Sequence, residues 1–134
     1  MEADLLAGRY ELGEVIGRGR YTVYAARDTR LGREVAVKRV GLATGPDEID
    51  DVRSRARREA RAAARMTSSH VVGVYDVIEE PDTVWLVMEL VRAPSLEAVV
   101  RERGPLPAAL AARIGLGVVD ALVAAHAVGV LHRD

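Results

Sequence analysis

Apolar and polar residues alternate along the first forty residues of the chain, a pattern typical of β-strands. It predicts strands over 10–16, 23–27 and 34–40, joined by turns at 17–20 and 31–32. Alternate residues of a strand share a face, so Lys38 lies on the same face as Ala36 and Val40. Three short strands joined by tight turns predict an antiparallel meander.

The spacing of apolar residues changes to three and four after Pro46, which predicts a helix ending near 67–69. Its first turns are acidic, which suits the helix dipole. Strands over 71–79 and 83–90 would complete a five-stranded antiparallel sheet with one inserted helix. A short helix over 95–103, with Ser95 as N-cap, and a long helix over 107–127 follow. The predicted class is α+β, with a break near 92–94.

Composition excludes several classes of function. The 134 residues carry a net charge of −1, which gives no reason to expect nucleic acid as a partner. The absence of Cys excludes a disulfide framework and a thiolate metal site. The N-terminus has no apolar segment of the kind found in signal peptides. The longest apolar stretch, 108–131, is interrupted by Arg113, Asp120 and His126, so a core helix is favoured over a membrane span.

Lys38 is the only lysine among nineteen basic residues. It shares a strand face with small apolar residues, where an ammonium needs an anion. A functional lysine is one interpretation, and an edge-strand lysine that reaches water is the other. Glu59 lies on the apolar stripe of the predicted helix and is the natural partner. The alternative is a surface glutamate paired with neighbouring arginines, since the helix's six arginines are expected to form a solvated face.

Gly17 and Gly19 lie between two predicted strands, so a dinucleotide-binding turn, which needs a following helix, is excluded. A glycine hairpin can lie over phosphate groups with its backbone N–H groups exposed. It can equally be an ordinary hairpin turn. The spacing leaves both interpretations open.

The ordered set of motifs resembles the protein kinase family, and its texture resembles bacterial serine/threonine kinases. The motifs that carry the resemblance are Ile16-Gly17-Arg18-Gly19 for the glycine-rich loop, Val35-Ala36-Val37-Lys38 for the third-strand lysine, Arg57-Arg58-Glu59-Ala60 for the helix glutamate, Leu86-Val87-Met88-Glu89-Leu90-Val91 for the gatekeeper and hinge, and Leu131-His132-Arg133-Asp134 for the start of the catalytic loop.

The resemblance implies a role for each matched position. Lys38 would contact the α- and β-phosphates of ATP and pair with Glu59, and Asp134 would accept the proton of the substrate hydroxyl. The nucleotide contacts it implies are Ile16, Gly17, Arg18, Gly19, Val23, Ala36, Lys38, Met88, Glu89 and Val91. Within that set, Ile16, Val23 and Ala36 would enclose adenine, while the backbones of Glu89 and Val91 would bond its edge.

Two departures from the family pattern matter. The glycine-rich loop is one residue short and lacks its third glycine. The family's Mg²⁺ ligands, an Asn and the Asp of Asp-Phe-Gly, lie beyond Asp134, and this sequence contains no Asn and no Phe. The resemblance therefore implies ATP and Mg²⁺ as cofactors, with no metal ligand in this chain.

The predicted organisation is an N-terminal extension (1–9), a kinase N-lobe (10–91) and a truncated start of the C-lobe (92–134). The implied function is phosphoryl transfer from ATP to protein Ser or Thr hydroxyls, performed in the cytoplasm by a longer parent. A pseudokinase-like module, which binds nucleotide or protein without catalysis, is the alternative. Expected partners are ATP and a protein substrate, with no nucleic acid and no membrane segment. Self-association through the long, exposed helix is a further expectation.

Overall fold

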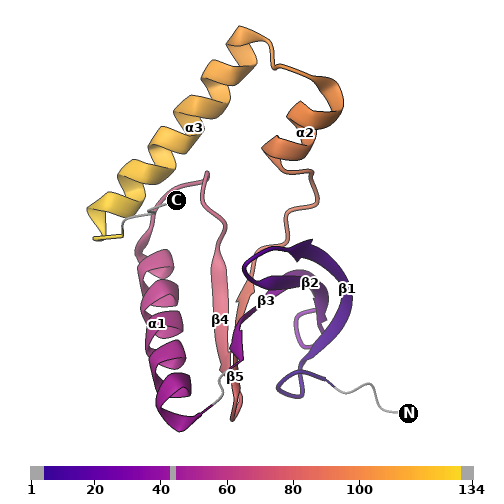
Figure 1. Ribbon diagram of the computed structural model, residues 1–134, viewed down its shortest axis with the longest axis vertical. Helices are drawn as coiled ribbons and strands as arrows, with labels where there is room; N and C mark the ends of the chain where they lie inside the picture. Colours follow the sequence, from indigo (N-terminus) through magenta and orange to yellow (C-terminus); the bar gives the residue numbers. More distant parts are fainter. Residues whose placement is uncertain (1–4, 43–44, 131–134) are drawn as a thin grey trace. The chain divides into compact units, whose positions relative to one another are not determined.

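The computed structural model describes residues 5–42 and 45–130 of the chain (Figure 1). The chain divides into two units, Met1–Ala64 with Gly73–Leu90, and Arg65–Val72 with Val91–Asp134. The first unit contains a β-sheet and helix α1 (Pro46–Arg65). The second contains helices α2 (Leu96–Arg103) and α3 (Ala108–Ala127).

The sheet has five antiparallel strands in the order β1-β2-β3-β5-β4, which confirms the predicted architecture. The strands are β1 (Tyr10–Arg18), β2 (Thr22–Asp28), β3 (Arg33–Leu42), β4 (Val74–Glu79) and β5 (Thr83–Met88). β3 lies in the centre, with hydrogen-bonded neighbours on both sides. The interpretation of Lys38 as an edge-strand residue is therefore wrong.

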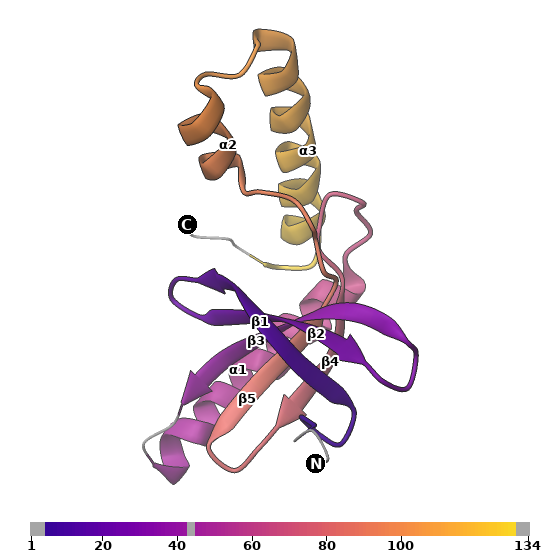
Figure 2. The ribbon, with the colours of Figure 1, turned by 90° about the vertical axis from the view of Figure 1, so that its right-hand side faces the viewer.

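The two faces of the sheet bury separate apolar clusters. One cluster centres on Val35, Val37 and Val87, and is closed at the N-terminal end by Leu6, which is 7% exposed. On the opposite face, α1 packs through Ile49, Ala56 and partly buried neighbours against Val84 and Leu86 of β5. Figure 2 shows α1 running along this face. The apolar residues that alternate along the strands, and those spaced by three and four along α1, therefore face the two cores, as predicted.

The first hairpin is longer and tighter than the sequence predicts. β1 continues to Arg18, because Gly17 pairs with Val23 and Arg18 with Thr22. The turn therefore comprises residues 19–21 instead of 17–20. It places Tyr21 at the end of the hairpin, next to the start of β2.

Three other boundaries differ by a few residues. α1 ends at Arg65, short of 67–69, and β4 begins at Val74 instead of 71. Residues 66–72, which lie between the two elements, belong to the second unit. The strand predicted over 83–90 ends at Met88. Beyond it, Glu89 pairs with Gly73, with its N–H donating to the Gly73 carbonyl at 2.8 Å and its carboxylate accepting from the Gly73 N–H at 3.2 Å.

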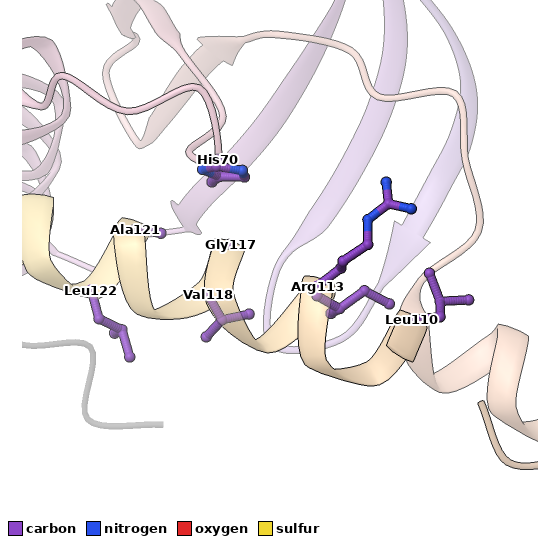
Figure 3. Close-up of a pocket in the computed structure, with 8 residues that line it drawn as sticks. His70, Leu110, Arg113, Gly117, Val118, Ala121 and Leu122 are labelled. Atoms are coloured by element: carbon purple, nitrogen blue, oxygen red, sulfur yellow. The ribbon is translucent and has the colours of Figure 1, made fainter. Parts of the chain in front are cut away.

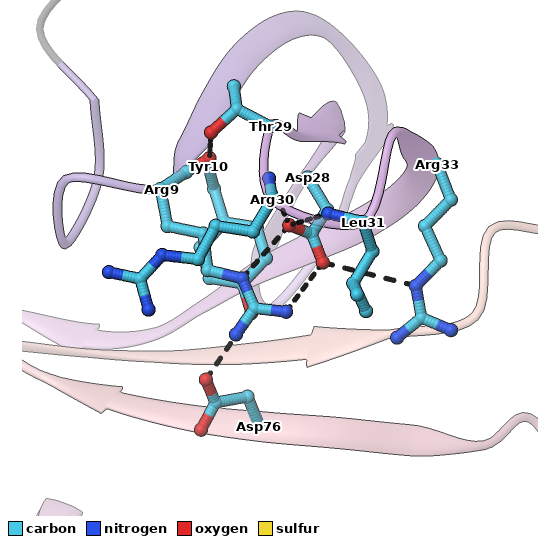
Figure 4. A network of polar contacts seen from close by, with 8 residues as sticks. All are labelled: Arg9, Tyr10, Asp28, Thr29, Arg30, Leu31, Arg33 and Asp76. Carbon is cyan, nitrogen blue, oxygen red and sulfur yellow. Dashed lines mark hydrogen bonds and ion pairs between the residues drawn. The ribbon is translucent and has the colours of Figure 1, made fainter.

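A buried carboxylate closes the turn between β2 and β3 (Figure 4). Asp28 is 1% exposed and accepts two hydrogen bonds from the Arg9 guanidinium, at 2.9 and 2.6 Å. It also accepts from the backbone N–H groups of Arg30 and Leu31, at 3.0 and 3.2 Å. The hydrogen bonds from Arg9 hold the pKa of Asp28 well below its usual value, with help from the two backbone donors, although burial acts in the opposite direction.

The two helices of the second unit bury little apolar surface. Ser95 caps α2 as predicted, since its hydroxyl accepts from the Ala98 N–H at 3.1 Å. α2 buries none of its residues, and α3 buries only Ala125 within the part of the chain that the structure describes. α3 is therefore exposed among the described residues, as the expectation of self-association assumes. By length and composition alone it would also suffice to cross a membrane, a test that core helices of soluble proteins pass too.

In the second unit, polar contacts join the segment after α1 to helix α3. His70 Nδ1 lies 2.9 Å from an Asp120 carboxylate oxygen, and the Ser68 hydroxyl donates to the same oxygen at 2.8 Å. These bonds lower the pKa of Asp120. Figure 3 shows the His70 ring beside Gly117. A Cβ at Gly117 would lie 2.9 Å from His70 Cδ2, so glycine is required for this approach.

Candidate nucleotide site

The strand pairing aligns three of the predicted site residues across the sheet. Gly17 of β1 is paired with Val23 of β2, and Val23 is paired with Lys38 of β3. Cross-strand partners of an antiparallel sheet point to the same face. Lys38 is also paired with Leu86, whose side chain belongs to the cluster beneath α1, so this is the face that α1 partly covers.

Lys38 and Glu59 form the predicted ion pair. Lys38 Nζ lies 3.7 Å from Glu59 Oε1, and the two side chains are 21% and 54% exposed. Glu59 is therefore more accessible than its place on the apolar stripe suggests, because the inward positions of α1 are taken by Ala56 and Ala60. The alternative of an i,i+4 pair with a neighbouring arginine is not realised by Glu59 among the described ion pairs.

Tyr21 is the residue of this site that the sequence analysis missed. Its ring centroid lies 4.8 Å from Lys38 Nζ, within the range of a cation–π contact. The guanidinium of Arg20 lies 5.7 Å from the same centroid. The pattern of the sequence gives no indication of this contact, because it depends on the turn moving from 17–20 to 19–21.

The glycines of the first hairpin leave open space next to the backbone. A Cβ at Gly19 would have no heavy atom within 4 Å, and one at Gly17 would meet only the Val23 side chain, at 3.4 Å. No described residue therefore lies close enough to require glycine at position 19. Arg18, between them, is exposed.

Two of the residues implied to enclose adenine, Val23 and Ala36, lie on the sheet face that carries Lys38. Val23 and Ala36 lie on neighbouring strands, and Ala36 is paired with Met88 at the end of β5. Ala36 is buried, Val23 and Met88 are half-buried, and Ile16 is 43% exposed. Small and aliphatic side chains here give an apolar surface.

The hinge residues fall on both sides of the division between the units. Glu89 is exposed and belongs to the first unit, where its N–H is bonded to Gly73. Val91 belongs to the second unit and is 54% exposed. Asp134 lies outside the residues that the structure describes, together with Leu131, His132 and Arg133.

Two of the six α1 arginines contact the β4–β5 hairpin, one of them while its side chain remains exposed. Arg57 forms an ion pair with Glu79 of β4 at 2.7 Å, and this hydrogen-bonded contact lowers the pKa of Glu79. Arg53 donates to the backbone carbonyl of Glu80 at 2.9 Å. Both contacts attach α1, the helix that carries Glu59, to the β4–β5 hairpin.

A divalent cation finds no ligand set in the described residues. No group of three or more His, Asp or Glu side chains is positioned to hold a metal across residues 5–42 and 45–130. The sequence has no Asn or Gln to add an amide oxygen. The donor set therefore fits a phosphate group, through Lys38 and backbone N–H groups, and does not fit Mg²⁺.

A solved structure has the same fold as this chain. The crystal structure of Rad53 1-466 in complex with AMP-PNP matches with a TM-score of 0.79 at 23% sequence identity. The match covers 94% of this chain and 32% of that one. At this level of identity the likeness establishes the fold.

Sequence relatives are bacterial. The chain is 42% identical over 137 residues to the probable serine/threonine-protein kinase PknB of Corynebacterium glutamicum, and 38% identical over 144 residues to that of Bifidobacterium longum. These alignments cover 97% and 100% of this chain but 21% of each relative, so the chain spans about a fifth of their length. The family model of the protein kinase domain matches residues 10–134, a range that includes the paired Lys38 and Glu59. The chain therefore belongs to the protein kinase domain family.

Proposed function

We propose that this chain supplies the ATP-binding half of a serine/threonine protein kinase. The observation that carries the proposal is the Lys38–Glu59 ion pair, formed on a central strand beside a glycine hairpin with open backbone. An ammonium held by a carboxylate and 21% exposed is oriented and still reachable by a phosphate group. Lys gives a compact point charge suited to this contact.

The other site residues are assigned by their positions around that pair. Gly17, Arg18 and Gly19 offer backbone N–H groups to the phosphates, since open space lies beside Gly19. Ile16, Val23, Ala36 and Met88 provide the apolar surface for adenine. The Glu89 N–H is already bonded to Gly73, so contact with the adenine edge falls to its carbonyl oxygen. Val91 adds the second backbone contact.

The proposal extends to the reaction of the longer protein. ATP would lose its γ-phosphoryl group to a protein Ser or Thr hydroxyl, and Asp134 would accept the hydroxyl proton. Mg²⁺ neutralises phosphate charge when it is bound, and its ligands are proposed to come from outside these 134 residues. A cytoplasmic location is part of the proposal, because ATP is the ligand.

The test is ATP titration of the 134-residue chain, followed by NMR or calorimetry. We expect weak binding, because the described residues of the sheet unit offer a partly exposed apolar surface for adenine. We expect Lys38→Met to reduce this binding at least tenfold. The matched control is Arg39→Met, which removes the adjacent cation from the opposite face of β3 and should change affinity less than twofold. Micromolar affinity that survives Lys38→Met would refute the assignment.

The same preparation separates catalysis from binding. These 134 residues are expected to transfer no labelled phosphate to a basic protein above a no-enzyme control, because the described residues hold no metal ligand set. Transfer that is abolished by Asp134→Ala would contradict this expectation. The non-catalytic alternative is distinguished by the reading frame beyond Asp134, where a Lys-x-x-x-Asn continuation followed by Asp-Phe-Gly supports an enzyme.

A further inference from the structure

Tyr21 covers one side of the Lys38 ammonium. Nζ lies 4.8 Å from the ring centroid and 3.7 Å from Glu59 Oε1. The ammonium therefore has a carboxylate as one partner and a neutral aromatic ring as another. The ring takes a position from which a phosphate oxygen could otherwise contact Nζ.

The ring also lies near a second cation. The Arg20 guanidinium is 5.7 Å from the same centroid, so two positive groups flank one neutral side chain. A cation–π contact is weaker than a charge-assisted hydrogen bond between an ammonium and a phosphate oxygen. A polyphosphate that displaced the ring would therefore exchange two weak contacts for stronger ones.

The turn that carries Tyr21 has room to move. Gly19 has open space around its Cβ position, and Gly17 is limited only by the flexible Val23 side chain. The β1–β2 register is also interrupted between Val15 and Gly17. Only the Gly17–Val23 and Arg18–Thr22 pairs lie between this interruption and the turn, so the end of the hairpin can shift and move the ring away from Lys38 without unpairing the rest of the sheet.

We propose that Tyr21 is a capping residue that competes with nucleotide phosphates for Lys38. In the nucleotide-free chain the ring covers the ammonium and holds it toward Glu59, and a bound polyphosphate displaces the ring. The inference rests on the proposed function and adds to it a device that keeps the lysine covered until a polyphosphate arrives.

The solitary lysine makes the contact directly measurable. Reductive methylation with ¹³C-formaldehyde labels Lys38 and the N-terminal amine, retains both charges, and Lys38→Arg identifies the Lys38 signal. We expect an upfield ring-current shift of this signal in the unsubstituted chain and in Tyr21→Phe, and its loss in Tyr21→Leu. Tyr75→Leu, which removes a ring that lies on Arg33 in β3, is the control and should leave the signal unchanged.

Titration with tripolyphosphate, and separately with ATP, tests the competition. Binding should remove the upfield shift. It should be roughly two- to fivefold tighter in Tyr21→Leu than in the unsubstituted chain, as expected from losing a cation–π contact at a partly exposed site. Tyr21→Phe and Tyr75→Leu should bind within twofold of the unsubstituted chain.

Each other outcome overturns the inference, and the outcomes separate it from the proposed function. Equal or weaker binding by Tyr21→Leu, or a shift that persists at saturation, means that the ring does not compete, while ATP binding stands. A missing upfield shift in the unsubstituted chain has the same meaning. Failure of every variant to bind either ligand overturns the proposed function together with the inference.

Discussion

The two units of this chain bury apolar side chains to very different extents. In the sheet unit, Val35, Val37, Val84, Leu86 and Val87 are fully buried in the clusters on the two faces. In the helical unit, only Ala125 is buried among the described residues, at 9% exposure. The sequence of the helical unit is no less apolar, since α3 has a mean hydropathy of 1.8. Its apolar surface therefore lacks a partner within the described residues.

This difference shows what a hydrophobic pattern does and does not specify. Apolar residues that alternate along a strand, or that form a single stripe on α1, select one face of that element for burial. In the sheet unit these faces pack against one another. α3 is apolar on several sides, so its sequence predicts that other elements surround it but does not identify those elements. The sheet unit carries the information for its own core, whereas α3 depends on surfaces that the described residues do not include.

The largest expected effect concerns the exposed stripe of α3. Leu116, Val119 and Val123 are 71%, 56% and 63% exposed and lie three and four residues apart, on one helix face. With their apolar neighbours on α3 they would gain about 1.5–3 kcal/mol each on full burial, on the order of 10 kcal/mol together. We expect the chain to self-associate at tens of micromolar, and Leu116→Glu with Val123→Lys to leave it monomeric in sedimentation.

The control exchanges two charges on α2, Arg101→Glu with Glu102→Arg, which alters the same number of residues without removing apolar surface. It should self-associate like the unsubstituted chain. A monomeric unsubstituted chain, with α3 protected in hydrogen exchange, would contradict the prediction. Partition of α3 into lipid vesicles in place of self-association would identify a membrane as its partner.

A matched pair of substitutions gives the next largest effect. Leu86 is completely buried beneath α1, while Leu116 is largely exposed on α3. Leu86→Ala should lower the free energy of unfolding of the sheet unit by about 2–5 kcal/mol. Leu116→Ala should change it by less than about 0.5 kcal/mol. Chemical denaturation followed by Trp85 fluorescence measures both, and equal effects would refute the comparison.

The sequence was sufficient to predict most of the fold. The meander of the first three strands, the inserted helix and the Ser95 cap follow from local patterns that need only near neighbours, and each is confirmed. The pairing of β3 with β5 was not predicted, because it joins residues about forty to fifty positions apart. The boundaries on either side of residues 66–72 were missed because that segment belongs to the second unit, where His70 contacts Asp120. No local pattern encodes a partner fifty residues away.

The charged residues of the site and their ion pair were predictable, and the aromatic contact of Lys38 was not. The rarity of lysine indicated Lys38, and helical spacing indicated Glu59, because both are properties of composition and period. Tyr21 was missed because the position of its ring depends on the turn, which comprises residues 19–21 instead of the predicted 17–20. The Arg9–Asp28 pair was missed because it joins the segment before β1 to the far end of β2, and no periodicity connects them.

The third prediction compares two carboxylates that accept hydrogen bonds, Asp28 in the sheet unit and Asp120 in the helical unit. Asp28 is buried and its pKa is lowered chiefly by Arg9, so its charged form stabilises the folded state at pH values above the unfolded pKa of about 3.9. That contribution is lost as the pH falls from about 4 toward the lower folded pKa. Asp28→Asn should therefore lower the melting temperature at pH 7 and make the loss of stability below pH 4 shallower.

The comparison is with Asp120→Asn in the helical unit. Asp120 and His70 are both more than half exposed, so water replaces much of what the pair provides. Asp120→Asn should lower the melting temperature less than Asp28→Asn does. Calorimetric melts of both variants from pH 2.5 to pH 7 measure the difference. The same loss in the two variants would show that burial of Asp28 adds nothing to its contacts.

The smallest expected effect concerns the cap of α2. This helix has eight residues and buries none of them, so packing contributes little and the Ser95 hydroxyl is the contact that fixes its first turn. Ser95→Ala removes the acceptor for the Ala98 N–H and should destabilise the helix by about 1 kcal/mol. Ser95→Asp retains an acceptor and should keep the helix intact. Hydrogen exchange at the amides of Ala98 and Val99 is the measurement, with about fivefold faster exchange expected in Ser95→Ala only. Unchanged exchange in Ser95→Ala would mean that contacts other than the Ser95 cap stabilise the first turn of α2. The helix would then resemble the elements of the sheet unit, which are stabilised by packing.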